Sequence, residues 1–454
     1  MKSLRMKKIT TERVSAAAFY AVILFAISFA RDRAVQPDLW ISVSDFLNFS
    51  IINDPKTFAR AGLEVAEQGW LTQPSAWIFN LWPPGFVLLL SGIFKLFGIG
   101  VPFLAVLLGL TIAAGAFMLM TVRRYLSFYV SAPVALLLPL VPFIFPVTRF
   151  FLLQPVGLSF GEGFSVIFFI TFAFLLLIAV KNRSMIQALA SGGFLALAAY
   201  FRSQYELIAL VLSFGFFGLL VLVVLADVFL KRKPAESNKY QALKMMALAV
   251  LAAQLLMLPW RIYHYVDSGR WGWVQTQEIV IRNALLPEEK LFEMGGDFVV
   301  LGGGHLACKF EPDYCGKTES SFFYKALFDH FGEWIEYKAL LAKSFWFPTI
   351  RYFPKLLAED VPADYLGNSI ILILFAASLY FLCVARKSSD FLVYFWILSS
   401  FYACFFVIFV LVQFEVRYFF LPKIFSIFIA LALASVAWSA RAKRGAAGAV
   451  TRAD

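Results

Sequence analysis

Charged residues are scarce in this chain of 454 residues. Asp, Glu, Lys and Arg together make up 15% of the sequence, whereas hydrophobic residues make up 61%. Soluble domains carry roughly a quarter charged residues, so this composition excludes a soluble globular protein. Apolar runs of about 20 residues recur along the chain, which also excludes a soluble enzyme with a single anchor. The composition therefore predicts an all-α polytopic membrane protein.

Cysteine and histidine are rare as well, at four and three residues. Cys383 and Cys404 lie in apolar runs, where we expect them to pack. Cys308 and Cys315 lie in the hydrophilic stretch CKFEPDYC. An oxidising compartment permits a disulfide there, but the spacing leaves two free thiols equally open. Two thiols without a matching histidine pair make a zinc site the less favoured interpretation. The sequence thus indicates no metal site and no cofactor, although a divalent metal requirement stays open.

Motifs of several soluble functions are missing. The glycine run at 302–304 is not followed by the lysine and serine of a phosphate-binding loop. No basic patch sits in a nucleic-acid reading motif, so we expect no nucleic-acid partner. The net charge of +11 comes instead from basic clusters that fall on alternate sides of successive apolar runs. This distribution follows the positive-inside bias and suits contact with anionic membrane lipids.

The apolar runs predict about ten transmembrane helices, with both termini on the cytoplasmic side. We expect them near residues 14–30, 100–121, 128–147, 163–180, 185–201, 206–230, 242–259, 367–385, 391–412 and 419–439. The stretch at 83–98 is too short and interrupted to span, and it fits an interfacial helix that returns to the same face.

The predicted organisation has one large outer segment between two membrane modules. It comprises an N-terminal transmembrane module at 1–260 with a first outer loop at 31–99, a partly helical outer lobe at 261–366, C-terminal transmembrane helices at 367–440, and a basic cytoplasmic tail at 441–454.

Acids, arginines and aromatic residues recur at the expected outer ends of these spans. The residues of interest are Asp54 and Trp82 in the first outer loop, Glu162 in GEGF, Arg202 in YFRSQYE, Arg261 and His264 in LPWRIYHYVDSG, and Arg417 and Tyr418 in FEVRYFFLP. A carboxylate beside an alcohol can act as a general base. Arginine donor forks suit a phosphate or pyrophosphate. The combination indicates a substrate with a lipid tail and a phosphate head.

Four motifs in order resemble the GT-C class of integral membrane glycosyltransferases, in particular the family of protein mannosyltransferases and the lipid A aminoarabinose transferase. They are DPKTFARAGLEVAEQGWLT, LWPPGFVLLLSGIFKLFG, GEGFSVIFF and FEVRYFFLP, within roughly 40–440 of the chain. Three positions depart from the family pattern. Trp82 replaces a histidine or lysine, Pro55 replaces a frequent second acid, and Glu162 stands where many members have Asp. These departures leave the sugar and any metal dependence open.

The resemblance implies an inverting transferase that moves a sugar from a polyprenyl-phosphate donor to a lipid, glycan or protein acceptor. It places the active site on the non-cytoplasmic face of a bacterial inner membrane. Asp54 takes the role of general base and Glu162 that of the second acid. The remaining site residues, Trp82, Arg202, Arg261, His264, Arg417 and Tyr418, would bind substrate.

Simpler interpretations stand beside these roles. Asp54 can cap a helix that starts at Pro55, and Glu162 can be an acid placed at a helix N-terminus. Arg417 can snorkel or pair with Glu415, and His264 can be a satisfied interfacial side chain. For the whole protein, the alternatives are a transporter or flippase of a lipid-linked saccharide and a catalytically silent assembly protein. Transporters usually show charges near the midplane and repeated halves, and the sequence shows neither.

Overall fold

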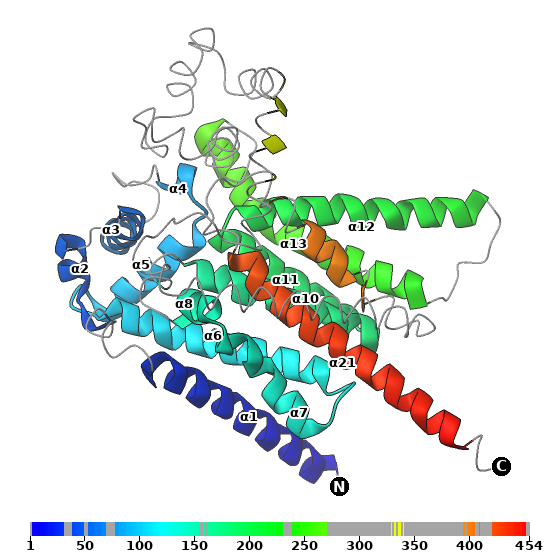
Figure 1. The fold of residues 1–454 in the computed structure, drawn as a ribbon. Helices are drawn as coiled ribbons and strands as arrows, with labels where there is room; N and C mark the ends of the chain where they lie inside the picture. The colour runs from blue at the N-terminus through cyan, green and yellow to red at the C-terminus, as the bar shows by residue number, and fades with distance from the viewer. Residues whose placement is uncertain are drawn as a thin grey trace.

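The computed structural model describes most of the chain outside the expected outer lobe (Figure 1). The described residues are 2–30, 39–49, 53–69, 78–153, 158, 161–229, 238–269, 328, 331, 332, 335, 336, 339, 394, 395, 397–404, 408 and 420–450. Within these residues every regular element is a helix, as the sequence predicts. The few described positions of the expected outer lobe, between 328 and 339, are helical too.

Five helices are long and apolar enough to cross a membrane. They are α1 (Lys2–Ala30), α6 (Phe103–Leu126), α10 (Glu162–Asn182), α12 (Gln204–Phe229) and α13 (Asn238–Ser268). Each of them overlaps one of the predicted spans over most of its length, so these five predictions hold by length and composition. The total of about ten spans is not confirmed, because 367–385 and about half of 391–412 lie outside the described residues, and three further predicted spans are shorter or broken.

Prolines break the predicted span at 128–147. Instead of one helix, the chain forms α7 (Ala132–Leu137), the 3-10 helix η2 (Leu138–Ile144) and α8 (Pro146–Leu153). Pro139 and Pro142 lie in η2, and each proline removes a backbone donor that an α-helix needs. The prediction of a continuous helix here is therefore wrong.

Two other predicted spans are short. Helix α11 (Met185–Phe201) has 17 residues, at the lower limit for a span. Helix α21 (Phe420–Val450) is longer, but its apolar part, Lys423–Ser439, is short.

Helix α10 forms the centre of the bundle. It packs against α6, α11, α13 and α21, and 83% of its apolar window is buried, against 22% for α1 and α12. A helix that is apolar on all sides is expected to be buried in this way, whereas α1 and α12 present apolar side chains outward, as membrane-facing helices do. Helices α11 and α13 cross closely, since a Cβ at Gly192 would lie 2.2 Å from the carbonyl oxygen of Ala249.

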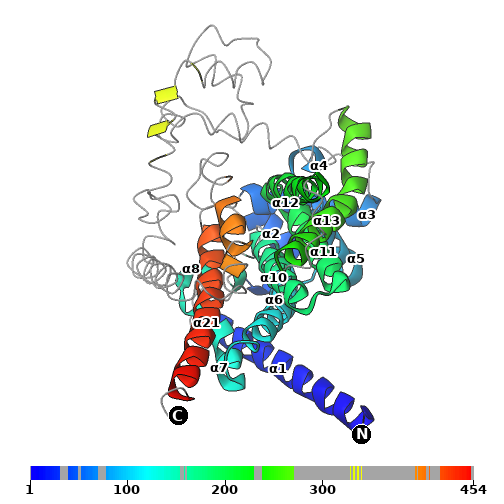
Figure 2. The same ribbon diagram turned by 90° about the vertical axis from the view of Figure 1, so that its right-hand side faces the viewer.

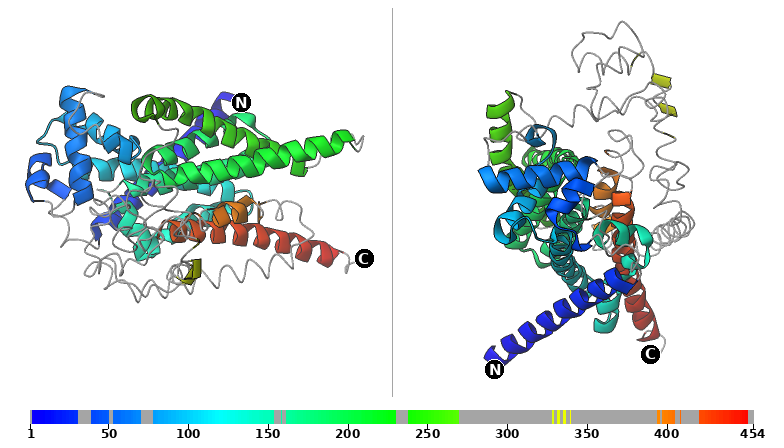
Figure 3. Two further views of the ribbon diagram at one scale, coloured as in Figure 1. Left: turned by 90° about the horizontal axis from the view of Figure 1, so that it is seen from above. Right: turned by 90° about the vertical axis from the view of Figure 1, so that its left-hand side faces the viewer.

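Four short helices cover one end of the bundle, which we call the loop end (Figures 1 and 3). They are α2 (Val43–Phe49), α3 (Asn53–Gln68), α4 (Ile78–Leu81) and α5 (Gly85–Phe97). At about 1.5 Å per residue, the 13 residues of α5 span only about 20 Å, too little to cross a bilayer. The prediction of a short, non-spanning helix at 83–98 is thus confirmed in length. Helix α5 packs between α3 and α11.

The start of α1 and the end of α21 lie on the opposite side of the molecule from α2, α3 and α4 (Figures 1 and 2). We call this side the terminal end. Helix α13 enters from the terminal end and continues past the predicted stop at 259, through Pro259, to Ser268. Arg261 and His264, at the start of the expected outer lobe at 261–366, therefore lie inside this helix.

Candidate functional site

A buried ion pair joins α10 and α11 at the loop end. Glu162 is the first residue of α10, and Arg202 directly follows α11. The Arg202 Nη2 atom lies 2.7 Å from Glu162 Oε1, and the two side chains are 4% and 1% exposed. The two helices are antiparallel and joined by a short turn at Arg183 and Ser184, so the start of one meets the end of the other. Charges in such a place need a partner, and each supplies one to the other.

The backbone at the start of α10 requires glycine. Gly161 precedes Glu162 with a φ of 70°, in the left-handed region that side chains disfavour. A Cβ on Gly161 would also lie 2.6 Å from the ring of Phe86 on α5. The motif GEGF thus fixes both the entry angle of the chain and the close approach of α5 to the acid.

Trp82 covers the guanidinium of Arg202. It lies between α4 and the Pro83–Pro84 turn that leads into α5, and its ring centroid is 5.6 Å from Arg202 Cζ. This distance is within the range of a cation–π contact. The second glycine of the region, Gly85, brings α5 against α11, since a Cβ there would lie 2.5 Å from the carbonyl oxygen of Tyr200. Arg202 therefore contacts a carboxylate and an indole.

Aromatic contacts connect this pair to α3. Phe58 meets the rings of Trp82 and Phe86 edge to face, each with centroids 5.6 Å apart. Asp54 lies one helical turn before Phe58, so both residues are on the same side of α3. Asp54 is partly exposed, whereas Glu162 is buried. The structure thus brings the helix of Asp54 together with Trp82, Arg202 and Glu162.

The position of Asp54 differs from the cap that the sequence suggests. Helix α3 begins at Asn53, so Asp54 lies in its first turn and does not precede it. An acid in the first turn still interacts favourably with the helix dipole.

A second ion pair joins α12 and α13 in the same manner. Glu206, in the first turn of α12, lies 2.6 Å from Nη2 of Arg261 on α13. The Nη1 atom of Arg261 donates to Gln254 Oε1 at 2.7 Å, and Gln254 donates to Ser213 Oγ at 2.9 Å. Each of the two hairpins, α10–α11 and α12–α13, therefore has an acid at one helix start held by an arginine from the other helix.

The remaining predicted site residues fall into two groups. His264 is buried on α13, one turn beyond Trp260. Arg417, Tyr418, Cys308 and Cys315 lie outside the described residues. The sequence argument did not assign Glu206, Gln254 and Phe58 to the site. Gln254 carried the clearest signal, as a polar residue inside an otherwise apolar run. In the described part of the chain, no group of three His, Cys, Asp or Glu side chains could hold a metal ion.

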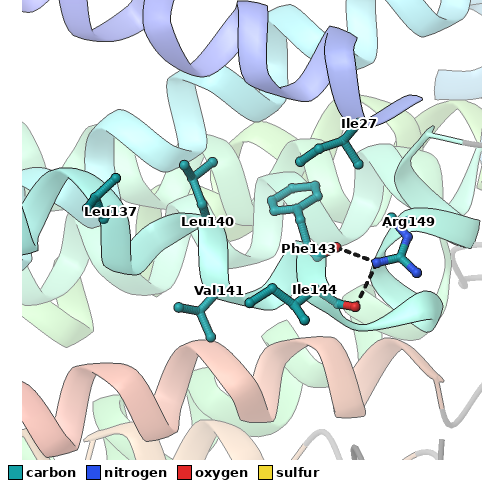
Figure 4. Close-up of a pocket in the computed structure, with 7 residues that line it drawn as sticks. All are labelled: Ile27, Leu137, Leu140, Val141, Phe143, Ile144 and Arg149. Carbon is teal, nitrogen blue, oxygen red and sulfur yellow. Dashed lines mark hydrogen bonds between the residues drawn. The ribbon is translucent and has the colours of Figure 1, made fainter. Parts of the chain in front are cut away.

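A cavity of about 450 Å³ lies between α1, α7 and η2, close to α8 (Figure 4). Its lining is apolar apart from one arginine, and consists of Ile27, Leu137, Leu140, Val141, Phe143, Ile144 and Arg149. The Arg149 Nη1 atom donates to the carbonyl oxygens of Phe143 at 2.8 Å and Ile144 at 2.6 Å. These bonds hold a cation at one end of an apolar cavity. The sequence argument did not single out Arg149.

Comparison with known proteins gives little beyond this geometry. No family model matches the chain, and no curated protein matches it. Among solved structures, the oligosaccharyltransferase of Archaeoglobus fulgidus in its apo form is similar, with 16% sequence identity and a TM-score of 0.44. The match covers 93% of this chain and 50% of that protein, so the chain spans half of its length. A likeness at this level identifies neither the family nor the activity.

Proposed function

We propose that this protein is a membrane glycosyltransferase that uses a polyprenyl-phosphate-linked sugar on the non-cytoplasmic face of a bacterial inner membrane. The observation that carries the proposal is the buried pair of Glu162 and Arg202, which lies under Trp82 and beside the helix of Asp54. Buried charges at the edge of membrane helices are costly, and they commonly mark functional sites. The motif resemblance supplies the reaction class.

Asp54 is the proposed general base. Its partial exposure leaves it open to an acceptor, which the buried Glu162 is not. The carboxylate of Asp54 takes the proton of an acceptor hydroxyl, whose oxygen then forms a bond to the anomeric carbon of the sugar. The bond from that carbon to the phosphate oxygen breaks at the same time, and polyprenyl phosphate leaves with the electron pair. This single displacement inverts the anomeric configuration.

The arginines are the proposed ligands of the donor phosphate, with Arg202, which is 4% exposed, reached when donor binding displaces Trp82 from its guanidinium. Glu162 and Glu206 orient Arg202 and Arg261 through charge-assisted contacts, so that the guanidinium groups stay in defined positions. Trp82 adds an aromatic face that a sugar ring can pack against. Arg417 and Tyr418 complete the proposed set, and His264 is a further candidate from α13. Because each acid offsets the charge of its arginine, the pairs carry no net positive charge to stabilise the leaving phosphate. A divalent metal is therefore proposed as a further aid to its departure.

The cavity beside Arg149 suits the lipid part of such a donor. Six apolar side chains line it and one cation lies at its end, which matches a hydrocarbon chain attached to an anionic phosphate. We assign part of the polyprenyl chain to this cavity.

The test uses the purified full chain with a panel of polyprenyl-phosphate sugars and acceptor fractions, with Mg²⁺, Mn²⁺ or a chelator. Release of polyprenyl phosphate together with a glycosylated acceptor is the expected result. Movement of labelled lipid across a vesicle membrane without sugar release would instead establish the transporter. If neither activity were observed, the assembly protein would be the remaining hypothesis. A chelator-sensitive rate would show the metal requirement.

A further inference from the structure

A second and larger cleft lies at the terminal end of the bundle, away from the candidate site. It has a volume of about 900 Å³ and runs between α1 and α6, with contributions from α7 and α10. Its α1 residues extend from Glu12 to Ala21, whereas the cavity beside Arg149 touches α1 at Ile27, nearer its other end. The cleft therefore lies nearer the start of α1 than the cavity beside Arg149 does.

The rim of this cleft carries a net positive charge. Arg13 on α1 and Arg123 and Arg124 at the end of α6 line it, together with a single acid, Glu12. Arg123 Nη2 lies 3.1 Å from Glu12 Oε1, so these two charges offset each other. Arg13 and Arg124 are exposed and form no ion pair with another described side chain. Two positive charges thus remain at the mouth.

The walls of the cleft are apolar and built largely from small residues. Ala17, Ala18 and Ala21 of α1 lie opposite Ala113, Ala116 and Phe117 of α6. Helices α1 and α6 are both long and apolar enough to cross a membrane, and in a bilayer the space between them would face the hydrocarbon core. Water is a poor occupant of such a space, and an acyl chain is a good one.

We propose that this cleft binds an anionic phospholipid from the leaflet at the terminal end. The phosphate contacts Arg13 and Arg124, and the acyl chains lie along the alanine walls. The charge at the rim matches an anionic headgroup, and the apolar walls match its tails. The positive-inside bias makes this the cytoplasmic leaflet, where anionic lipid attracts basic residues at the ends of helices.

A second copy of the chain is the competing occupant, because small residues also allow helices to approach closely. A symmetric dimer places the same patch of each copy against the other. It would bring Arg13 and Arg124 near their counterparts, and four like charges would meet at one interface. The charge distribution therefore favours the lipid.

The experiment titrates the delipidated full chain in detergent with dioleoyl phosphatidylglycerol or dioleoyl phosphatidylcholine and counts bound lipid by native mass spectrometry. We expect tighter binding of the anionic lipid to the wild type. Arg13→Gln and Arg124→Gln should each weaken it about fivefold, because one basic side chain near an anionic surface contributes about 1 kcal/mol. The double variant should weaken it about 25-fold on the same basis.

Two further variants separate the contribution of charge to lipid binding from that of the shape of the cleft. Ala18 is exposed on α1, so Ala18→Phe fills the cleft without disturbing the core, and it should lower binding of both lipids. Lys244 is an exposed cation on α13 outside the cleft, and Lys244→Gln should leave binding unchanged. Equal binding of the two lipids by the wild type would overturn the proposal. A loss with Lys244→Gln equal to that with Arg124→Gln would overturn it too, as would a dimer that Ala18→Phe dissociates with no effect on lipid.

Discussion

Glu162 and Arg202 are 40 residues apart in the chain and meet at 2.7 Å in the buried end of the α10–α11 hairpin. The α12–α13 hairpin repeats the arrangement with Glu206 and Arg261 at 2.6 Å. In both, the acid lies in the first turn of a helix, where the helix dipole favours negative charge. Each pair ties the two ends of a hairpin together, and Trp82 connects the first pair to α3 through Phe58.

Removal of one partner of the buried pair should destabilise the protein strongly. Glu162→Gln or Arg202→Gln leaves one buried charge without its counterion, at a cost of about 3–5 kcal/mol by comparison with soluble proteins. The double variant, with two amides in place of the charges, should recover part of this loss. Thermal unfolding in detergent, arranged as a double-mutant cycle, measures the coupling.

The exposed pair at the terminal end is the matched control for this cycle. Glu12 lies 3.1 Å from Arg123, but its side chain is 65% exposed. Surface pairs contribute about 0–1 kcal/mol, so Glu12→Gln should change the unfolding temperature little. Additive effects of Glu162→Gln and Arg202→Gln would contradict the coupling.

Replacement of Trp82, whose indole lies over Arg202, should destabilise the fold more than replacement of an exposed tryptophan. Trp82→Ala removes a cation–π contact of about 1–2 kcal/mol and the ring contact with Phe58. Trp82→Phe keeps a ring in place and should retain most of the stability. Trp40, which is 63% exposed, is the control, and Trp40→Ala should be close to neutral. An equal fall in unfolding temperature for Trp82→Ala and Trp40→Ala would show that the contact of Trp82 with Arg202 does not stabilise the fold.

Gly161 should tolerate no side chain. Gly161→Ala forces a Cβ into the left-handed region and to within 2.6 Å of Phe86, and we expect a loss of about 2 kcal/mol or more. Gly109 is a helical glycine of α6 with open space around it, so Gly109→Ala should be neutral or stabilising by up to about 1 kcal/mol. Phe86→Leu combined with Gly161→Ala should relieve the contact but not the backbone strain, so that recovery is partial. Full recovery would show that φ has no part in the cost.

The sequence was most informative about helices that consist of one uninterrupted apolar run. The helices α1, α6 and α10 follow from such runs, because burial or membrane exposure of apolar side chains decides their structure. The breaks after Leu137 and Ile144 follow from prolines, whose effect on the backbone outweighs the hydropathy of the run. At Pro259 the helix does not break, and α13 continues through it to Ser268. In membrane helices neighbouring groups can satisfy the freed carbonyl, so proline alone does not end a helix there.

Pairings in the candidate site were only partly predictable. A short turn between two spans places Glu162 and Arg202 at the same end, and the sequence therefore selected both residues. It could not show that they contact each other, because that depends on helix rotation and on the approach of α5 through Gly85 and Gly161. The contact of Trp82 with Arg202 joins segments 120 positions apart, and no local pattern encodes it.

Asp54→Asn should strongly lower the rate of sugar transfer without loss of the fold. Asp54 is partly exposed, so neutralisation leaves no buried charge, and loss of a general base lowers the rate about 10²–10⁴-fold. Asp45 is the control, because it lies in the first turn of α2 and accepts a hydrogen bond from Ser42 at 2.6 Å. Asp45→Asn should change the unfolding temperature as much as Asp54→Asn but leave transfer intact. Equal transfer rates for the two variants would show that Asp54 is not the general base and acts only as an acid in the first turn of α3.

The cavity beside Arg149 should set the preference for donor chain length. Val141 lines this cavity together with Leu140 and Phe143, so Val141→Phe fills space that we assign to the polyprenyl chain. We expect the KM for a long-chain donor to rise roughly tenfold, because a few lost apolar contacts of about 0.8 kcal/mol per methylene suffice. The KM for a donor with a short chain should stay unchanged, since that chain does not reach the cavity. Ile186, which is 80% exposed on α11, provides the matched variant Ile186→Phe, and both KM values should be unaffected there. A parallel rise in KM for both donors with Val141→Phe would place the chain elsewhere and leave the cavity with a packing role.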